Sequence, residues 1–336
     1  MLKFSEFPVR IIDVSQFNDN AETDYKPTFE KLIAEGFRGV GIRVGYGIVE
    51  DRMFRWYWEK AKGKMDRAPY FYFDFYSHKG TGMRIEDWAI EQAAFCANLL
   101  RADPGEMKLK IDCEPSIFDK ITLVNASEYA RGVKAFIMEY FRLTGVWIEI
   151  YCSPGLLWVF GDWFKDLDLW LAWYNRLITW KDILNKVASY KWRGQVRIWQ
   201  YASDGDINND GIADGLQLGL ESKFLDLNVF LGTEEDYSVY CGGTQVVEHP
   251  ASEDPEDETQ AIPAGNTREI AVKKVASVVN MRAAPMAGPS VPIFKALPVG
   301  TTVECLERIQ RPGEIWWRIG QGQYCAELYN GMTFLK

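Results

Sequence analysis

The chain has 336 residues, and its composition of 47% hydrophobic and 25% charged residues is ordinary for a globular protein. A formal net charge of −9 argues against a nucleic-acid-binding protein, because such proteins carry a basic surface. No apolar run approaches the ~20 residues of a membrane-spanning helix, so membrane insertion is not expected. The first residues lack an apolar core of signal-peptide length, which predicts synthesis in the cytoplasm.

The cysteines and histidines of this sequence do not indicate a disulfide framework, a metal site or histidine-based catalysis. The six cysteines are scattered and form no C-x-x-C pair, which predicts buried free thiols rather than a disulfide framework or a zinc site. The only two histidines are His78 and His249, so histidine-based triads and histidine-rich metal sites are nearly excluded.

Eight short apolar segments, taken in chain order, have the composition of buried strands. They span residues 10–15, 39–44, 70–76, 108–114, 147–152, 167–174, 196–201 and 225–230. Helical periodicity is present between the early strands, at residues 27–35, 51–62, 85–100 and 126–144. This alternation predicts an α/β fold in which a parallel sheet closes as a TIM-like β/α barrel. The connections after the fifth strand are only about a dozen residues long, so we expect an incomplete ring of outer helices there.

Two carboxylates, Asp112 and Glu114, end the fourth predicted strand. Because successive side chains of a strand point to opposite faces, both should project on one side, away from Cys113. Pro115 then stops the strand. Burying two acids is costly unless they are paired or functional.

Polar residues also collect at the carboxyl ends of the other predicted strands. This set comprises Asp13, Arg43, Asp74, Tyr151, Tyr174 and Gln200, and Asp226 lies near the start of the last strand. The active sites of β/α barrels lie on the face that the carboxyl ends of the strands form. The recurrence favours a catalytic role for Asp112 and Glu114 over an ion-paired strand end.

A polar loop has the D-x-N-x-D-G-x-x-D spacing of a calcium-binding loop. Alternate oxygens would wrap one cation, and Gly211 would allow the turn. The candidate ligands are Asp206, Asn208, Asp210 and Asp214. Position twelve is Gln217, where an acid would normally stand, and no flanking helix pair is evident. Either a structural calcium ion or a polar turn fits this loop, and no cofactor is required for chemistry.

The composition changes after the last predicted strand. Residues 242–267 are acidic, contain proline and glycine, and carry almost no large apolar residues, which predicts a linker after a barrel domain of residues 1–241. Residues 268–336 contain short β segments with frequent turns and predict a small all-β barrel.

Six sequence blocks of the first domain, in order, resemble glycoside hydrolase family 25, the β/α-barrel lysozymes. They read I-I-D-V-S-Q, K-I-D-C-E-P, W-I-E-I-Y-C-S-P, L-W-L-A-W-Y, I-W-Q-Y and L-D-L-N-V-F. The resemblance implies an N-acetylmuramidase that cleaves the β-1,4 bond between N-acetylmuramic acid and N-acetylglucosamine in bacterial peptidoglycan. It places the family's carboxylates on Asp13, Asp112, Glu114 and Asp226, and its aromatic and amide positions on Tyr151, Tyr174 and Gln200. The second and third strands depart from the family's usual blocks. These departures affect the expected substrate contacts more than the expected catalytic residues.

Under this reading, Glu114 is the general acid, with a raised pKa. Asp112 stays ionised and either stabilises the oxocarbenium-like state or orients the substrate's N-acetyl group. Asp13 and Asp226 either support these two or are hydrogen-bonded acids at the barrel end. Tyr72, Tyr151, Trp173 and Tyr174 are candidate sugar platforms, and each could equally be a packing residue. The sequence leaves retention and inversion open, because that depends on the separation of the carboxyl groups.

The last segment resembles a bacterial SH3-like domain. V-N-M-R-A-A-P at residues 279–285 and W-W-R-I at residues 316–319 carry the resemblance. It implies attachment to the cell wall, and a spacer or a dimerisation module is the alternative. The combination looks like a phage endolysin, made in the host bacterial cytoplasm and active at the wall after release.

Two other functions stay open at this point. One is a barrel glycosidase that acts on chitin or another glycan, and the other is a non-catalytic wall-binding protein. The sequence does not give the oligomeric state.

Overall fold

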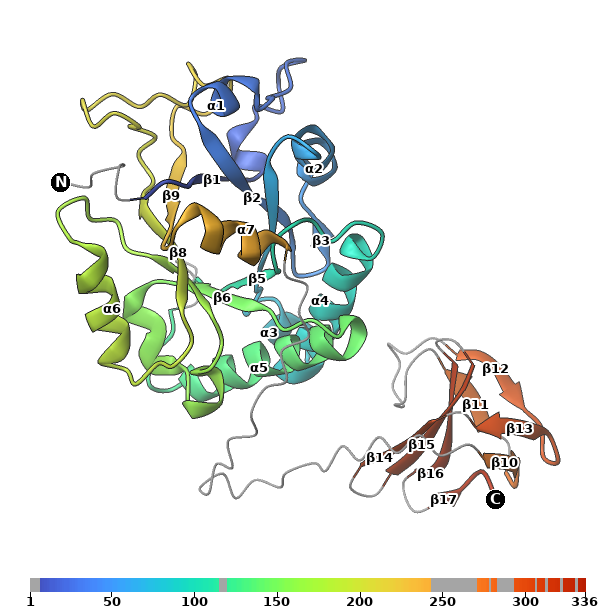
Figure 1. The fold of residues 1–336 in the computed structure, drawn as a ribbon. Helices are drawn as coiled ribbons and strands as arrows, with labels where there is room; N and C mark the ends of the chain where they lie inside the picture. Colours follow the sequence, from blue (N-terminus) through green and yellow to red (C-terminus); the bar gives the residue numbers. More distant parts are fainter. Residues whose placement is uncertain are drawn as a thin grey trace. The chain divides into compact units, whose positions relative to one another are not determined.

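The computed structural model describes most of the chain. The described residues are 7–114, 120–242, 271–277, 279–282, 293–305, 307–311, 314–320, 323–329 and 332–336. The chain divides into two compact units, Met1–Ser252 and Glu253–Lys336, and Figure 1 draws both. Apart from Gly242, the predicted linker lies outside the described residues.

The first unit is built on a closed barrel. Its sheet has the order β1-β9-β8-β7-β6-β5-β4-β2-β3, and it closes because β1 also pairs with β2. The eight barrel strands are β1 (Arg10–Val14), β2 (Phe37–Tyr46), β4 (Asp66–Tyr72), β5 (Lys110–Asp112), β6 (Glu149–Cys152), β7 (Leu169–Ala172), β8 (Val196–Ala202) and β9 (Asp226–Phe230). The short β3 (Val49–Glu50) forms a hairpin with β2. Strand β4 both begins and ends four residues before its predicted range of 70–76. Asp74 therefore lies beyond the end of this strand.

The direction of the last strand differs from the prediction. The six pairings from β1 through β2, β4, β5, β6, β7 and β8 are parallel, whereas β9 is antiparallel to both β8 and β1. The expectation of an all-parallel barrel is therefore wrong for β9. Parallel neighbours need a crossover that carries the chain back along the barrel. Residues 203–225 contain no helix or strand, and they return the chain at the same end.

Helices cover the outside of the barrel unevenly (Figure 1). The early connections contain α1 (Glu30–Ala34), α2 (Phe54–Ala61), α3 (His78–Thr81), α4 (Ile85–Leu100) and α5 (Ala126–Thr144). The connection from β6 to β7 contains only the 3-10 helices Pro154–Val159 and Asp162–Phe164, and α6 (Trp180–Ala188) precedes β8. Helix α5 forms because Tyr129, Val133, Phe136 and Tyr140 repeat every three or four residues on one buried face. Gly145 ends it with a φ of 74°.

Alternate residues of the strands face the barrel interior. One apolar cluster fills this interior, and a larger one lies between the strands and the helices. Trp170 of β7 occupies the middle of the interior, opposite Gly41. A Cβ atom on Gly41 would lie 2.7 Å from both the Trp170 ring and the Asp13 Cβ atom, so this position needs glycine.

The amino ends of the strands are closed by α7 (Glu234–Gly242), which lies across the barrel in Figure 1. Tyr237 and Tyr240 of α7 are buried with the interior cluster. The Tyr240 hydroxyl donates to Glu149 Oε2 at 2.7 Å, and Glu149 lies 3.6 Å from the buried Lys110 ammonium. The polar chemistry at the carboxyl ends of the strands is therefore at the opposite end of the barrel.

The described residues of the second unit form only strands and their connections. A six-stranded sheet contains β12 (Ile293–Leu297), β11 (Val279–Arg282), β16 (Gln323–Tyr329), β15 (Glu314–Gly320), β14 (Glu307–Arg311) and β17 (Met332–Thr333). Strands β10 (Ala271–Lys274) and β13 (Thr302–Cys305) pair separately. Trp316 and Trp317 are consecutive in β15 and both are buried, so both faces of this strand are covered.

Candidate active site

Four carboxyl groups meet at the carboxyl end of the barrel. Asp13 and Asp112 lie near the ends of β1 and β5, Glu114 follows β5, and Asp226 begins β9. Asp226 reaches the same end because β9 runs antiparallel, opposite Asp13 in the ladder. The charge of Glu114 acts on the pKa values of the other three acids. The predicted carboxylate set is therefore assembled in one place.

Asp13 is buried and held by two amides. Its Oδ2 accepts hydrogen bonds from Gln200 Nε2 at 2.9 Å and from Asn228 Nδ2 at 2.8 Å. Burial raises the pKa of Asp13 to about 6, although both hydrogen bonds oppose the rise. A carboxyl group with these partners has a fixed orientation, which suits a supporting role.

Asp112 is buried, with 5% of its surface exposed, and its Oδ1 has no hydrogen-bond partner among the described residues. Burial and the neighbouring Glu114 carboxyl raise the pKa of Asp112 well above its usual range, and the Arg43 guanidinium opposes this. An unpaired buried acceptor costs about 1–3 kcal/mol. This oxygen is therefore available to a group that comes from outside the chain.

Glu114 is the exposed member of the cluster. Its Oε1 lies 3.1 Å from the Tyr151 hydroxyl, and its backbone carbonyl accepts from the Tyr72 hydroxyl at 3.2 Å. Desolvation by the surrounding protein raises the pKa of Glu114, and the Tyr151 hydroxyl opposes it. The raised pKa favours a protonated carboxyl group that solvent can reach.

The pKa of Asp226 is raised further than that of Asp13. Burial raises it to about 9, and the charges of Asp13 and Glu114 contribute. Near neutral pH, Asp226 is therefore protonated and can donate as well as accept a hydrogen bond.

A chain of amides and hydroxyls joins these acids. Gln200 Oε1 accepts from the Tyr151 hydroxyl at 2.7 Å and from the Tyr174 hydroxyl at 2.8 Å. Trp170 Nε1 donates to Asn228 Oδ1 at 2.8 Å. Asn228 and Trp170 were not predicted from the sequence, although Asn228 lies two residues after Asp226 and so shares its face of the strand.

The predicted sugar platforms have different surroundings. Tyr174 is 53% exposed at the catalytic end, and Tyr151 is buried inside it. Tyr72 is half-buried, with its hydroxyl on the Glu114 backbone. Trp173 packs against the outer hydrophobic cluster, and its backbone carbonyl accepts from Trp199 Nε1 at 3.0 Å. This placement agrees with the packing alternative for Trp173.

Arg43 and Phe17 extend the site beside Asp112. Arg43 Nε donates to Asp51 Oδ2 at 2.7 Å, and its Cζ atom lies 4.9 Å from the centre of the Phe17 ring. Phe17 is 72% exposed. Phe17 was not predicted from the sequence, because one phenylalanine in a loop has no distinguishing pattern.

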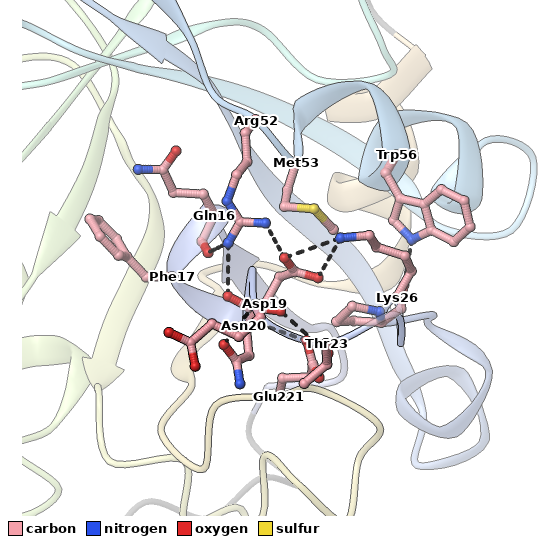
Figure 2. Close-up of polar contacts among 12 residues, drawn as sticks. Gln16, Phe17, Asp19, Asn20, Thr23, Lys26, Arg52, Met53, Trp56 and Glu221 are labelled. Atoms are coloured by element: carbon pink, nitrogen blue, oxygen red, sulfur yellow. Dashed lines mark hydrogen bonds and ion pairs between the residues drawn. The ribbon is translucent and has the colours of Figure 1, made fainter.

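The turn that carries Phe17 is fixed on several sides (Figure 2). The buried Asp19 carboxylate pairs with Lys26 and Arg52, and Arg52 also donates to the Gln16 carbonyl at 2.9 Å. Glu221 accepts from the Asn20 backbone at 2.7 Å and so joins this turn to the loop before β9. The exposed Phe17 ring therefore stands on a rigid support.

The loop of the calcium prediction is held by hydrogen bonds to its own backbone amides, and calcium binding stays a prediction. Asp206 accepts from the backbone amides of Asp210 and Gly211, Asn208 accepts from Asp210, and Asp214 accepts from Ile207. These bonds orient the side-chain oxygens toward the loop's own amides. Within the described ranges, no group of three or more His, Cys, Asp or Glu side chains is arranged to hold a metal ion. The loop matches the polar-turn alternative.

A closed barrel that ends in a cluster of buried and exposed carboxyl groups is suited to glycoside hydrolysis. The model of the glycosyl hydrolases family 25 matches residues 12–210. The chain belongs to this family, and it is a glycoside hydrolase. A comparison with curated proteins gives no match. No helix in the described part of the chain is long and apolar enough to cross a membrane.

Solved structures share the fold of the first unit. A family 25 glycosyl hydrolase from Bacillus anthracis is 18% identical with a TM-score of 0.51, over 71% of this chain and 96% of that chain. A muramidase from Trichobolus zukalii is 18% identical with a TM-score of 0.50, over 70% of this chain and 100% of that chain. A bacterial lysozyme from Streptomyces coelicolor is 14% identical with a TM-score of 0.50, over 70% and 97%.

Proposed function

We propose that the protein is an N-acetylmuramidase that cleaves the β-1,4 bond between N-acetylmuramic acid and N-acetylglucosamine in bacterial peptidoglycan. The observation that carries this proposal is an exposed Glu114, whose pKa is raised, together with a buried Asp112 whose Oδ1 has no hydrogen-bond partner among the described residues. Family membership supports it, and similar folds occur in a muramidase and a lysozyme.

In the proposed reaction, Glu114 donates its proton to the glycosidic oxygen as the bond to the anomeric carbon breaks. The anomeric carbon becomes positive as the bond breaks, and this growing charge favours the ionised form of Asp112, which burial disfavours in the free enzyme. The unpaired Oδ1 of Asp112 either stabilises this carbon directly or accepts from the N–H of the substrate's acetamido group. Asp13, fixed by Gln200 and Asn228, keeps the site negative and so favours both the proton on Glu114 and a cationic transition state.

Sugar rings would contact the exposed aromatic side chains at this end. Tyr174 and Phe17 are our candidates, since both are more than half exposed. Tyr174 donates to Gln200, and Phe17 lies against Arg43, whose charge acts on Asp112. The Phe17 ring is also held in place, because the backbone of its neighbour Gln16 is hydrogen-bonded to Asp51 and Arg52. A platform fixed before binding loses little conformational entropy when a sugar stacks on it.

We assign wall attachment to the second unit, which we propose is SH3-like. Its support is the resemblance of residues 279–285 and 316–319, of which 283–285 lie outside the described residues. Because Trp316 and Trp317 are buried in the core, they are not the binding surface. Sedimentation with purified cell walls should retain the full chain more strongly than residues 1–242. Equal retention would favour a spacer.

The proposal also includes how the enzyme reaches the cell wall. An endolysin made in a host bacterium would act on peptidoglycan after its release from the cytoplasm. Expression inside a bacterium should then be tolerated until the membrane is permeabilised, when the culture should clear. Lysis without permeabilisation would contradict this route.

The test of the proposed function uses purified peptidoglycan with wild type and Glu114→Gln side by side. New reducing ends and product masses are measured. Muropeptides that end in reducing N-acetylmuramic acid, and that are lost with the variant, are the expected products. Products that end in N-acetylglucosamine would mean that another bond is cleaved. Release from chitin but not from peptidoglycan would move the substrate to another glycan, and wall binding without products would indicate a non-catalytic protein.

A further inference from the structure

The hydrogen bonds between Asp13 and its neighbours have a fixed donor direction. Trp170 Nε1 can only donate, so its bond to Asn228 Oδ1 turns Asn228 Nδ2 toward Asp13. Gln200 Nε2 donates to the same Asp13 oxygen. The oxygen of Gln200 must therefore face away from Asp13, toward the tyrosine hydroxyls.

At this point the Tyr151 proton has two carbonyl or carboxyl oxygens within reach, and the Tyr174 hydroxyl is a further hydrogen-bond partner of Tyr151. The Tyr151 oxygen lies 2.7 Å from Gln200 Oε1 and 3.1 Å from Glu114 Oε1. A hydroxyl group has a single proton, so it cannot donate to both. If Tyr151 donates to Gln200, its contact with Glu114 is favourable only when Glu114 is protonated and donates to the Tyr151 oxygen. If Glu114 is ionised, the charge-assisted bond draws the Tyr151 proton to it.

Tyr174 determines the energetic cost of turning the Tyr151 hydroxyl from Gln200 to Glu114. Its hydroxyl lies 2.8 Å from Gln200 Oε1, so Gln200 keeps a donor when Tyr151 turns away. Gln200 is buried, with 2% of its surface exposed, and solvent cannot replace a lost donor there. Without Tyr174, turning Tyr151 toward Glu114 would leave a buried acceptor unpaired, which is unfavourable.

We propose that the Tyr151 hydroxyl is a two-position switch that follows and adjusts the protonation of Glu114, with Gln200 and Tyr174 as its positioning residues. When Glu114 carries a proton, Tyr151 donates to Gln200. When that proton passes to the departing glycosidic oxygen, Tyr151 turns to the new carboxylate and stabilises it. Tyr174 holds Gln200 in both states. The proposal rests on the proposed function only for the role of Glu114 as the acid.

Other charged and titratable groups also face this cluster from the surrounding strands. They are Asp13 from β1, Arg43 from β2, Tyr70 and Tyr72 from β4, Asp112 from β5 and Asp226 from β9. Exchanging a tyrosine for phenylalanine leaves all of them in place. A change that such a variant causes in the Glu114 titration therefore belongs to the missing hydroxyl.

The test is a titration of Glu114 by carbon NMR with carboxyl-labelled glutamate, assigned through the signal that Glu114→Gln removes. Tyr151→Phe should lower the acid ionisation constant of Glu114 about tenfold, because the carboxylate loses its donor. Tyr174→Phe should lower it in the same direction, because Tyr151 is then retained by Gln200. The double variant should equal Tyr151→Phe alone.

Tyr57→Phe is the matched control. Tyr57 is a buried tyrosine of α2 whose hydroxyl has no hydrogen-bond partner within the described ranges, so the Glu114 titration should not change. In the wild type, the ring-carbon signal of Tyr151 should shift with the same midpoint as Glu114, and Glu114→Gln should abolish that shift. This last measurement stands even if a phenylalanine variant does not fold.

Two results would overturn the switch. One is a Tyr174→Phe variant with an unchanged Glu114 titration, and the other is a Tyr174 effect that persists fully in the Tyr151→Phe background. The pH profile of peptidoglycan cleavage gives a second reading, since its basic limb should move to higher pH in Tyr174→Phe. A wild type that titrates as expected but does not cleave peptidoglycan would contradict the proposed function alone.

Discussion

Asp13 and Asp226 stand opposite each other in the antiparallel ladder between β1 and β9. Asp13 is the fourth residue of its strand and Asp226 the first of its own, so only an antiparallel last strand brings them to the same end. After burial, the charge of Asp13 is the next cause that raises the pKa of Asp226. The reversed strand therefore completes the carboxyl cluster.

Removing the acid should abolish turnover without unfolding the protein. Glu114 is exposed, and an amide oxygen can still accept from Tyr151, so Glu114→Gln should melt near the wild-type temperature. A general acid contributes about 10²–10⁴-fold, and we expect a loss of this order in kcat on peptidoglycan. Near-normal turnover would remove Glu114 from the mechanism.

Asp112→Asn should separate activity from stability. Burial and the nearby acids disfavour an ionised group at this position, and a neutral amide of the same shape relieves that repulsion. We expect severe loss of cleavage together with a higher melting temperature at neutral pH. A lower melting temperature would show that the carboxylate has a structural partner.

The stability of the barrel should fall as pH rises. Burial raises the pKa of Asp13 to about 6 and that of Asp226 to about 9, both above the 3.8 of an unfolded chain. The folded state holds protons that the unfolded state releases, so this stability is complete below about pH 4 and is lost toward pH 9. Thermal denaturation should show the fall, and Asp226→Asn should make it less steep above about pH 6, where the raised pKa of Asp112 still contributes. A slope that is unchanged in this variant would assign the effect to other groups.

Phe17→Ala tests the platform beside Arg43. Losing an aromatic contact of about 1 kcal/mol should raise KM for peptidoglycan roughly fivefold, with kcat preserved. The melting temperature should change little because Phe17 is 72% exposed. Val239→Ala, which removes an exposed apolar side chain from α7, should leave KM unchanged. Equal KM values for both variants would exclude Phe17 from binding.

Truncation should show that α7 belongs to the barrel. A chain that ends at Gly242 should stay folded, whereas one that ends at Gly232 loses Tyr237 and Tyr240 and uncovers the Lys110–Glu149 pair. Loss of even one large buried aromatic side chain costs about 3–5 kcal/mol. Denaturant unfolding of the two fragments should differ by at least that amount. Equal stability would mean that α7 does not close the barrel.

Local patterns in the sequence determined the catalytic end of the barrel to a large extent. The D-x-E pair after a buried strand, and polar residues at other strand ends, indicated Asp112, Glu114, Asp13, Tyr151 and Gln200, because the period of a strand fixes which side chains share a face. For the polar loop at residues 206–214 the sequence left a calcium ion and a polar turn both open, because spacing cannot show whether carboxylates turn toward a cation or toward their own backbone amides. The placement of Phe17 depends on Asp51 and Arg52, which no local pattern connects with it.

By itself, the sequence determined the number of barrel strands, their apolar faces and the set of acids, since these follow from periodicity and residue type. Only the tertiary structure decided that β9 runs antiparallel, because strand direction depends on the path of the preceding connection. It also decided which hydroxyl and amide groups donate hydrogen bonds to one another and to Asp13. Those bonds join Asn228, Gln200 and Tyr151 from three different strands, and the closure of the barrel brings these residues together.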